Sequence, residues 1–275
     1  MNIFIYDKTW EGLLTIVFES YKMKLFPDML LNIGEVQPLF VDICIEVETA
    51  QEKAVKVWNR LKKKMLPQVL NMLQAVWLSE EKGNDLLIFQ YIRKAIDNQF
   101  INRSDFGDPL IVEVHQLAKK VYKEKHALEQ FVRFQRSKDN IYFAPVHPVY
   151  NSLPLAIPHF KDRFASQQWI IYDLKRKYGF YYDLHQVIEM TLEGEGEHLN
   201  TGRMKEDLMH EEELLFQELW KKYYKSLTIK ERINLKQQKQ YFHRKIIHFL
   251  SKNQLLRSAS SSPIRFISLA FKVQQ

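Results

Sequence analysis

Residues 169–183 read Trp-Ile-Ile-Tyr-Asp-Leu-Lys-Arg-Lys-Tyr-Gly-Phe-Tyr-Tyr-Asp and decide the fold class. Two runs rich in β-branched and aromatic residues, Trp169–Asp173 and Tyr178–Asp183, flank the charged segment Leu174–Lys177. This order of strand-forming run, short turn and second strand-forming run is typical of a β-hairpin. We therefore predict an antiparallel pair of strands here.

The preceding segment repeats this pattern. Phe131–Gln135 and Ile141–Ala144 are strand-like and enclose the turn Ser137–Asn140, and a helix is expected after Pro154. Two hairpins joined by a helix predict an α+β fold, in which helices cover at least one face of an antiparallel sheet. N-terminal strands could extend this sheet.

The first hundred residues have mostly helical periodicity. A short strand at residues 3–6 precedes a helix marked by Leu13, Val17 and Tyr21, and a second strand is expected at residues 39–47. Thr49–Glu52 has the spacing of a capping box. Further helices are expected at residues 50–64, 66–78 and 83–99.

The polar stretch 101–107 is the predicted domain boundary, because Asp108-Pro109 then offers an N-cap followed by proline at the first helical position. The helix that follows should run to about residue 130. The predicted parts are a mostly helical region with short strands (1–107), a hairpin-helix-hairpin core with C-terminal helices (108–257), and a tail (258–275).

The C-terminal third divides into an acidic and a basic stretch. Residues 189–218 hold ten acids and two basic residues, whereas residues 221–257 hold eleven Lys or Arg and one acid, Glu231. A helix is expected at residues 205–225, with Leu208, Leu215, Leu219 and Tyr223 on its buried face. Further helices are expected from Thr228 and at residues 244–250. The basic stretch could contact phosphate or form a solvated helical face.

Composition predicts a folded cytoplasmic protein. The 275 residues carry a net charge of +7, and hydrophobic residues make up 46% of the chain. The start of the sequence resembles no signal peptide, and no apolar run is long enough to span a bilayer. The single cysteine, Cys44, lies in an apolar run and is predicted to be a buried thiol.

Cofactor motifs are absent from the sequence. It contains no GxGxxG, GxxxxGK[ST], HExxH or GxSxG motif, and one cysteine cannot supply a cysteine cluster. We therefore expect no cofactor and no bound metal. His126, His147 and His159 flank the hairpins without a diagnostic spacing, and the acidic residues near His210 suit a helix N-terminus without any metal.

The hairpins interleave basic and aromatic residues. Arg133, Lys175 and Arg176 fall close to Phe131, Tyr172 and several other aromatic residues. Bases stack on aromatic rings while Lys and Arg bind phosphates, which suits a platform for single strands or flipped bases. The alternative is that these aromatic residues belong to the sheet and its core, since aromatic residues favour strands in any case.

Several of these segments resemble an uncharacterised bacterial DNA-metabolism family. The similarity runs in order over most of residues 1–250, apart from departures at Ala127–Gln130 and His243–Ile247. The segments that carry it are Ile5–Leu14, Phe131–Phe134, Pro158–Phe164, Trp169–Asp173 with Arg176, Leu219–Tyr224 and Glu231–Asn234. The family is associated with a radical-SAM protein of presumed DNA modification or repair, and related copies are fused to a uracil-DNA-glycosylase-like domain.

The resemblance implies an accessory protein in DNA repair or modification that binds DNA and a radical-SAM partner. The iron-sulfur site of radical-SAM chemistry would belong to that partner, since it needs three cysteines. Nucleic-acid contacts are predicted at Arg133, Arg163, Lys175, Arg176, Tyr182, Arg232, Asn234, Lys236 and Lys239. One alternative is a DNA hydrolase with His159, Asp173 and Asp183 as candidate catalytic residues, and another is an interaction protein without DNA contact.

Overall fold

The computed structural model describes residues 1–97, 107–192 and 209–227, which contain seven helices and eight strands. These residues form two compact units. The first comprises Met1–Lys123 with Tyr150–Ser152, and the second comprises Glu124–Val149 with the chain from Leu153 onward. The fold is mixed α/β with two separate sheets, so the N-terminal strands do not extend the sheet of the hairpins.

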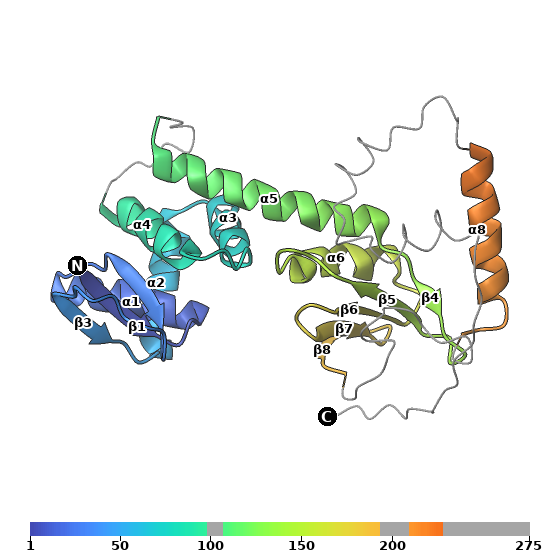
Figure 1. Cartoon of the computed structure of the whole chain (residues 1–275), viewed down its shortest axis with the longest axis horizontal. Coiled ribbons are helices and arrows are strands. Elements are labelled where there is room, and N and C mark those ends of the chain that lie inside the picture. Colours follow the sequence, from blue (N-terminus) through green and yellow to red (C-terminus); the bar gives the residue numbers. More distant parts are fainter. Residues whose placement is uncertain (98–106, 193–208, 228–275) are drawn as a thin grey trace. The chain divides into compact units, whose positions relative to one another are not determined.

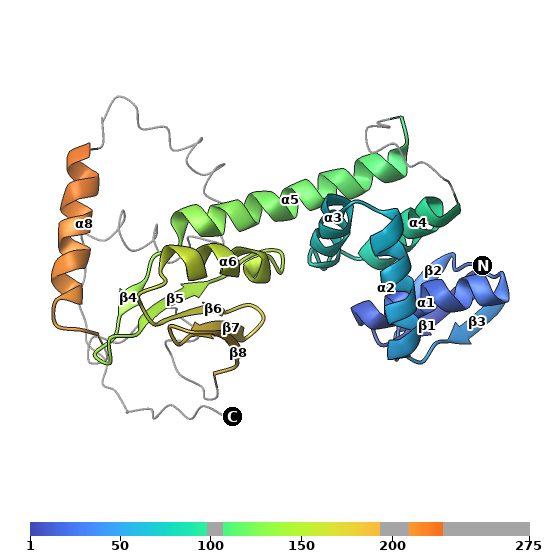
Figure 2. The ribbon, with the colours of Figure 1, turned by 180° about the vertical axis from the view of Figure 1, so that it is seen from behind.

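The first unit is built on a three-stranded parallel sheet. Its central strand β1 (Asn2–Tyr6) lies between β2 (Met29–Asn32) and β3 (Ile43–Glu46) (Figure 2). The helices of this unit are α1 (Trp10–Met23), α2 (Gln51–Lys64), α3 (Pro67–Trp77), α4 (Asn84–Asp97) and the first part of α5 (Pro109–Phe131). Apolar residues of β1, α1 and α4, including Phe4, Leu13 and Phe89, are fully buried.

The predicted helices of this unit are confirmed, but the capping box is wrong. The N-cap of α2 is Ala50, which makes no side-chain cap hydrogen bond. The Thr49 hydroxyl donates instead to Asp7 Oδ2 at 2.9 Å, because the end of β1 lies beside the start of α2. The Ala50 amide donates to Thr15 Oγ1 on α1 at 3.2 Å. Contacts between distant segments therefore replace the local cap.

The predicted strand at residues 39–47 is reduced to the four residues of β3. Leu39 and Phe40 belong to the loop before it. The prediction of a buried Cys44 is also wrong, because its thiol is exposed. The reason is position: β3 is an edge strand paired with β1 alone, and most of its side chains are exposed or half-buried. An apolar run therefore did not indicate a buried strand here.

The second unit holds a five-stranded sheet in the order β4-β5-β6-β7-β8. Its strands are β4 (Gln135–Arg136), β5 (Tyr142–Val146), β6 (Trp169–Asp173), β7 (Tyr178–Tyr182) and β8 (Val187–Met190). Helix α6 (Leu153–Arg163) lies over one face (Figure 1). Leu153, Ala156 and Phe160 of this helix pack there with Ala144, Trp169 and Ile171 of the sheet.

The expectation of a purely antiparallel sheet is wrong. Both hairpins are antiparallel, although the predicted strand Phe131–Gln135 is wrong in its bounds, because α5 ends at Phe131 and β4 begins only at Gln135. Strands β5 and β6 pair in parallel, with Tyr142 opposite Trp169. Helix α6 forms the crossover between these two strands. Such a connection returns the chain to the end of the sheet at which β5 began, so that β6 runs in the same direction as β5. Strand β8, which the sequence analysis did not predict, pairs antiparallel with β7.

Helix α8 (Glu213–Leu227) confirms a helix in the predicted region, although it begins later than expected. Its expected buried face is wrong at Leu215 and Leu219, which are both exposed. The expected helices after Thr228 and the tail lie outside the described residues.

Gly179 marks a close approach of β7 to β6. A Cβ atom at this position would lie 2.5 Å from the Ile171 carbonyl oxygen and 2.9 Å from Tyr172 Cα, which are backbone atoms and cannot turn away. We expect Gly179→Ala to lower the free energy of unfolding by about 1–3 kcal/mol, the usual cost of overpacking. Denaturant unfolding measures this effect, and Ser166→Ala in an exposed loop serves as the control. An unchanged midpoint for Gly179→Ala would contradict this packing.

Candidate functional site

Asp173, a predicted catalytic candidate, closes β6 in a fully buried position. Its Oδ1 accepts hydrogen bonds from the backbone amides of Lys175 at 2.8 Å and Arg176 at 3.2 Å. Its Oδ2 accepts from Arg176 Nη1 at 2.9 Å, and the Arg176 side chain is only 10% exposed. The carboxylate thus holds the β6–β7 turn and neutralises a buried guanidinium.

The same turn binds the segment that follows β5. Arg176 Nη2 and Lys175 Nζ both donate to the Val149 carbonyl, at 3.1 and 2.6 Å. The Val149 amide donates at 2.7 Å to Oε1 of Glu124, a buried residue of α5. Arg176 is therefore engaged in the fold, whereas Lys175 is exposed to solvent.

Tyr182 and Asp183 lie at the other end of β7. The Tyr182 ring is buried 5.4 Å from the Trp169 ring, and its hydroxyl donates to the Leu184 carbonyl at 2.8 Å. Asp183 Oδ1 accepts from the backbone amides of Gln186 at 2.7 Å and His185 at 2.8 Å. These hydrogen bonds lower the pKa of the Asp183 carboxyl below its ordinary value. Both side chains organise the turn before β8.

The structure does not bring the two candidate carboxylates together. Trp169 pairs with Tyr182 and Asp173 pairs with Tyr178, so Asp173 and Asp183 flank opposite ends of the hairpin. The four residue-to-residue steps from Trp169 to Asp173 separate these ends by roughly 13 Å. The candidate histidine, His159, is exposed on α6. Within the described ranges no three His, Cys, Asp or Glu side chains are grouped to hold a metal ion.

The other predicted nucleic-acid residues are dispersed. Arg133 is exposed between α5 and β4, and Arg163 is exposed at the last residue of α6. With Lys175, they are the predicted basic residues of the second unit that face solvent, and their role stays a prediction. The predicted residues Arg232, Asn234, Lys236 and Lys239 lie outside the described residues.

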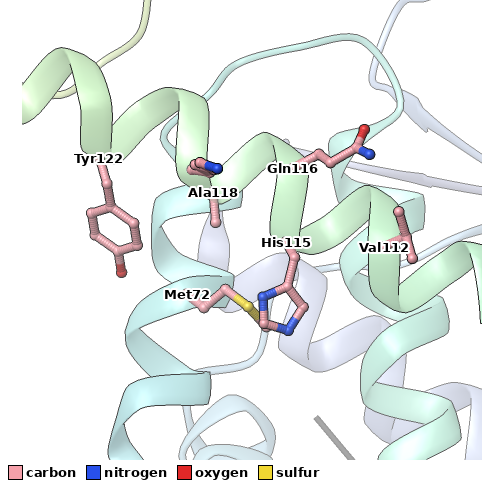
Figure 3. Close-up of a pocket in the computed structure, with 7 residues that line it drawn as sticks. Met72, Val112, His115, Gln116, Ala118 and Tyr122 are labelled. Carbon is pink, nitrogen blue, oxygen red and sulfur yellow. The ribbon is translucent and has the colours of Figure 1, made fainter. Parts of the chain in front are cut away.

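A hollow of about 500 Å³ lies in the first unit between α3 and α5. Met72 of α3 and Val112, His115, Ala118 and Tyr122 of α5 line it, and Figure 3 shows the His115 ring beside the Met72 side chain. Burial raises the pKa of Tyr122. The lining is mostly apolar, so it can receive an apolar group but supplies no paired carboxylates or nucleophile.

The loop between β2 and β3 is a surface that the sequence analysis missed. Val36, Leu39 and Phe40 are 93%, 95% and 88% exposed, and Ile33 and Ile43 at its ends are also exposed. Five large apolar side chains exposed within eleven residues are the kind of feature that often marks a binding site on a protein surface. The signal in the sequence is the charge around the loop: residues 25–52 contain six acids and no Lys or Arg.

These features define an α/β protein with a structural ion pair at its central hairpin and an exposed apolar loop bordered by acids. Residues 82–251, more than half of the chain, match the family described as a domain of unknown function, DUF4130. The chain therefore belongs to this family. Its description states no activity, and the association with a radical-SAM protein stays a proposal.

Other comparisons add little. No curated protein matches the chain significantly. A solved pGpG-specific phosphodiesterase, PggH from Vibrio cholerae, is 12% identical, with a TM-score of 0.31 over 66% of this chain and 81% of that chain. A similarity this low assigns neither fold nor activity. Among the described residues, no helix combines the length and the apolar character that crossing a membrane requires.

Proposed function

We propose that this chain is an accessory protein of DNA repair or modification, which docks a partner protein through the β2–β3 loop and binds nucleic acid elsewhere. The exposed apolar side chains Val36, Leu39 and Phe40 carry this proposal. A few residues at the centre of an interface supply most of its binding energy, and this buried centre is more apolar than the rim. The loop thus favours a docking role.

Charge restricts the partner. Glu35, Glu46 and Glu48 accompany the apolar side chains, and the segment offers no basic residue of its own. Asp42 already pairs with the N-terminal amine of Met1. Two copies of this loop would place acids against acids, which is unfavourable for self-association. The fitting partner presents an apolar surface with Lys or Arg around it.

The resemblance described above names a radical-SAM protein as that partner. Its chemistry needs an iron-sulfur cluster held by three cysteines, and this chain has one cysteine. In the proposed assembly the partner carries the cluster and the reaction. This chain supplies recognition or presentation of the DNA.

We expect the double substitution Leu39→Asp/Phe40→Asp to weaken binding to the purified radical-SAM protein at least about tenfold, since buried interface anchors often contribute more than 2 kcal/mol each. Isothermal titration calorimetry with the cluster-loaded partner measures the affinity. Leu66→Asp is the matched control, because Leu66 is 58% exposed in the same unit but lies outside the loop.

A protein with an intact fold should keep its unfolding midpoint in all these variants, since the substituted side chains face solvent. If the wild type and the double variant bind the partner with equal affinity, the loop is not part of the interface. If the wild type does not bind, the radical-SAM protein is not the partner.

A further inference from the structure

Three tryptophans of the first unit meet at its surface. Trp10 is the first residue of α1, Trp58 lies in α2 and Trp77 is the last residue of α3. The ring of Trp10 lies edge-on to the other two, with centroids 6.0 Å from Trp58 and 5.5 Å from Trp77. All three are only half-buried. Their contacts join helices that are distant in sequence.

The three tryptophans are less buried than the aromatic residues in the core of the same unit. Phe4, Phe89 and Tyr91 are at most 1% exposed, as expected for aromatic residues whose role is packing. The three tryptophans keep part of their indole surface in water, although each is larger than those residues. A large aromatic ring held partly open at a surface is available to a ligand.

Helix α2 adds positive charge beside Trp58. It carries six Lys or Arg and one acid, Glu52. Lys53 pairs with Glu19 at 2.7 Å, and Lys64 donates to the Ile96 carbonyl. The remaining four have no ion pair within the part of the chain that the structure describes, and they are exposed: Lys56, Arg60, Lys62 and Lys63.

The helical geometry brings one of these cations over the ring of Trp58. Lys62 follows Trp58 by one turn, and its Nζ lies 5.5 Å from the centroid of that ring. At about 100° per residue, Asn59, Lys63 and Lys56 continue from Lys62 around the solvent side of α2. A basic strip thus begins at the tryptophan cluster.

We propose that this surface binds single-stranded nucleic acid, with bases stacking on Trp58 and its neighbouring tryptophans while Lys56, Lys62 and Lys63 bind phosphates. Every base has a flat aromatic face, so stacking on indole tolerates any sequence but requires unpaired bases. An acidic peptide would satisfy the lysines and leave the indole surface unused. The site is separate from the docking loop and does not depend on the proposed partner.

The test is fluorescence anisotropy of the full chain with a labelled oligothymidylate of about 15 nucleotides at several salt concentrations. We expect Trp58→Ala to weaken binding about 5- to 150-fold, the range found when one stacking residue is removed. Lys62→Ala/Lys63→Ala should weaken binding and reduce the log-log salt slope by roughly 0.7 for each lost phosphate contact. Lys138→Ala/Lys161→Ala removes the same charge from the second unit and should leave the slope nearly unchanged.

Two outcomes would overturn the proposal. One is wild-type affinity in a folded Trp58→Ala protein, and the other is equal affinity for an abasic deoxyribose-phosphate chain of the same length, which has no bases to stack. If Trp58→Ala does not fold, the lysine pair decides, because those exposed side chains contribute little to stability. If the lysine variant keeps the wild-type salt dependence of binding, α2 does not contact the phosphates. This conclusion holds whether or not the docking loop binds its partner.

Discussion

Replacing Trp169 with alanine is expected to lower the free energy of unfolding by about 3–5 kcal/mol, the usual cost of removing a large core aromatic. The side chain is fully buried, and its ring centroid lies within 6.5 Å of those of Phe134, Phe160 and Tyr182. It therefore fills the space between the sheet and α6. The substitution would leave a cavity that the neighbouring strands and helix cannot close without moving.

Denaturant unfolding measures this loss of stability. Amide exchange in β5 and β6 then shows whether the loss falls in the unit that contains Trp169. Trp169→Phe is the informative companion, because Trp169 Nε1 has no hydrogen-bond partner within the described structure. Phenylalanine keeps most of the buried ring and removes an unsatisfied donor, so it should cost less than alanine. A Trp169→Ala protein that unfolds at the wild-type midpoint but fails to bind DNA would make Trp169 a contact residue.

The β6–β7 hairpin was predictable because its information is local. Two runs rich in β-branched and aromatic residues and the four-residue turn between them lie within fifteen positions, and the structure confirms the antiparallel pair. The direction of β5 relative to β6 is set by α6 and by pairing between residues 27 positions apart. Alternation shows which residues share a face but does not identify the neighbouring strand.

The surfaces were harder to predict than the strands. Asp173 and Asp183 look alike in sequence, since each lies where a strand meets a turn, yet one is fully buried with Arg176 and the other is only half-buried. Leu39 and Phe40 read as the start of a buried strand because hydrophobicity does not show which strand is at the edge. Trp10, Trp58 and Trp77 meet only through tertiary packing.

Asp173→Ala is expected to destabilise the protein by about 3–5 kcal/mol, the cost of breaking a buried ion pair by removing one partner. The substitution would leave the Arg176 guanidinium buried without its carboxylate, and the amides of Lys175 and Arg176 would lose their acceptor. Asp173→Asn keeps an oxygen for those amides and should cost less than alanine. Denaturant unfolding at neutral pH measures all three proteins.

Asp183→Ala is the matched control for this prediction. Asp183 also accepts two backbone amides in the turn after a strand, but it is solvent-accessible and has no ion pair in the described structure. Its loss should cost about 0.5–1.5 kcal/mol, since water can replace the carboxylate as the acceptor. Equal costs at the two positions would show that the buried guanidinium adds nothing to the energetics of the turn. A DNA-hydrolysing activity that Asp173→Asn abolishes in a stably folded protein would instead make Asp173 catalytic.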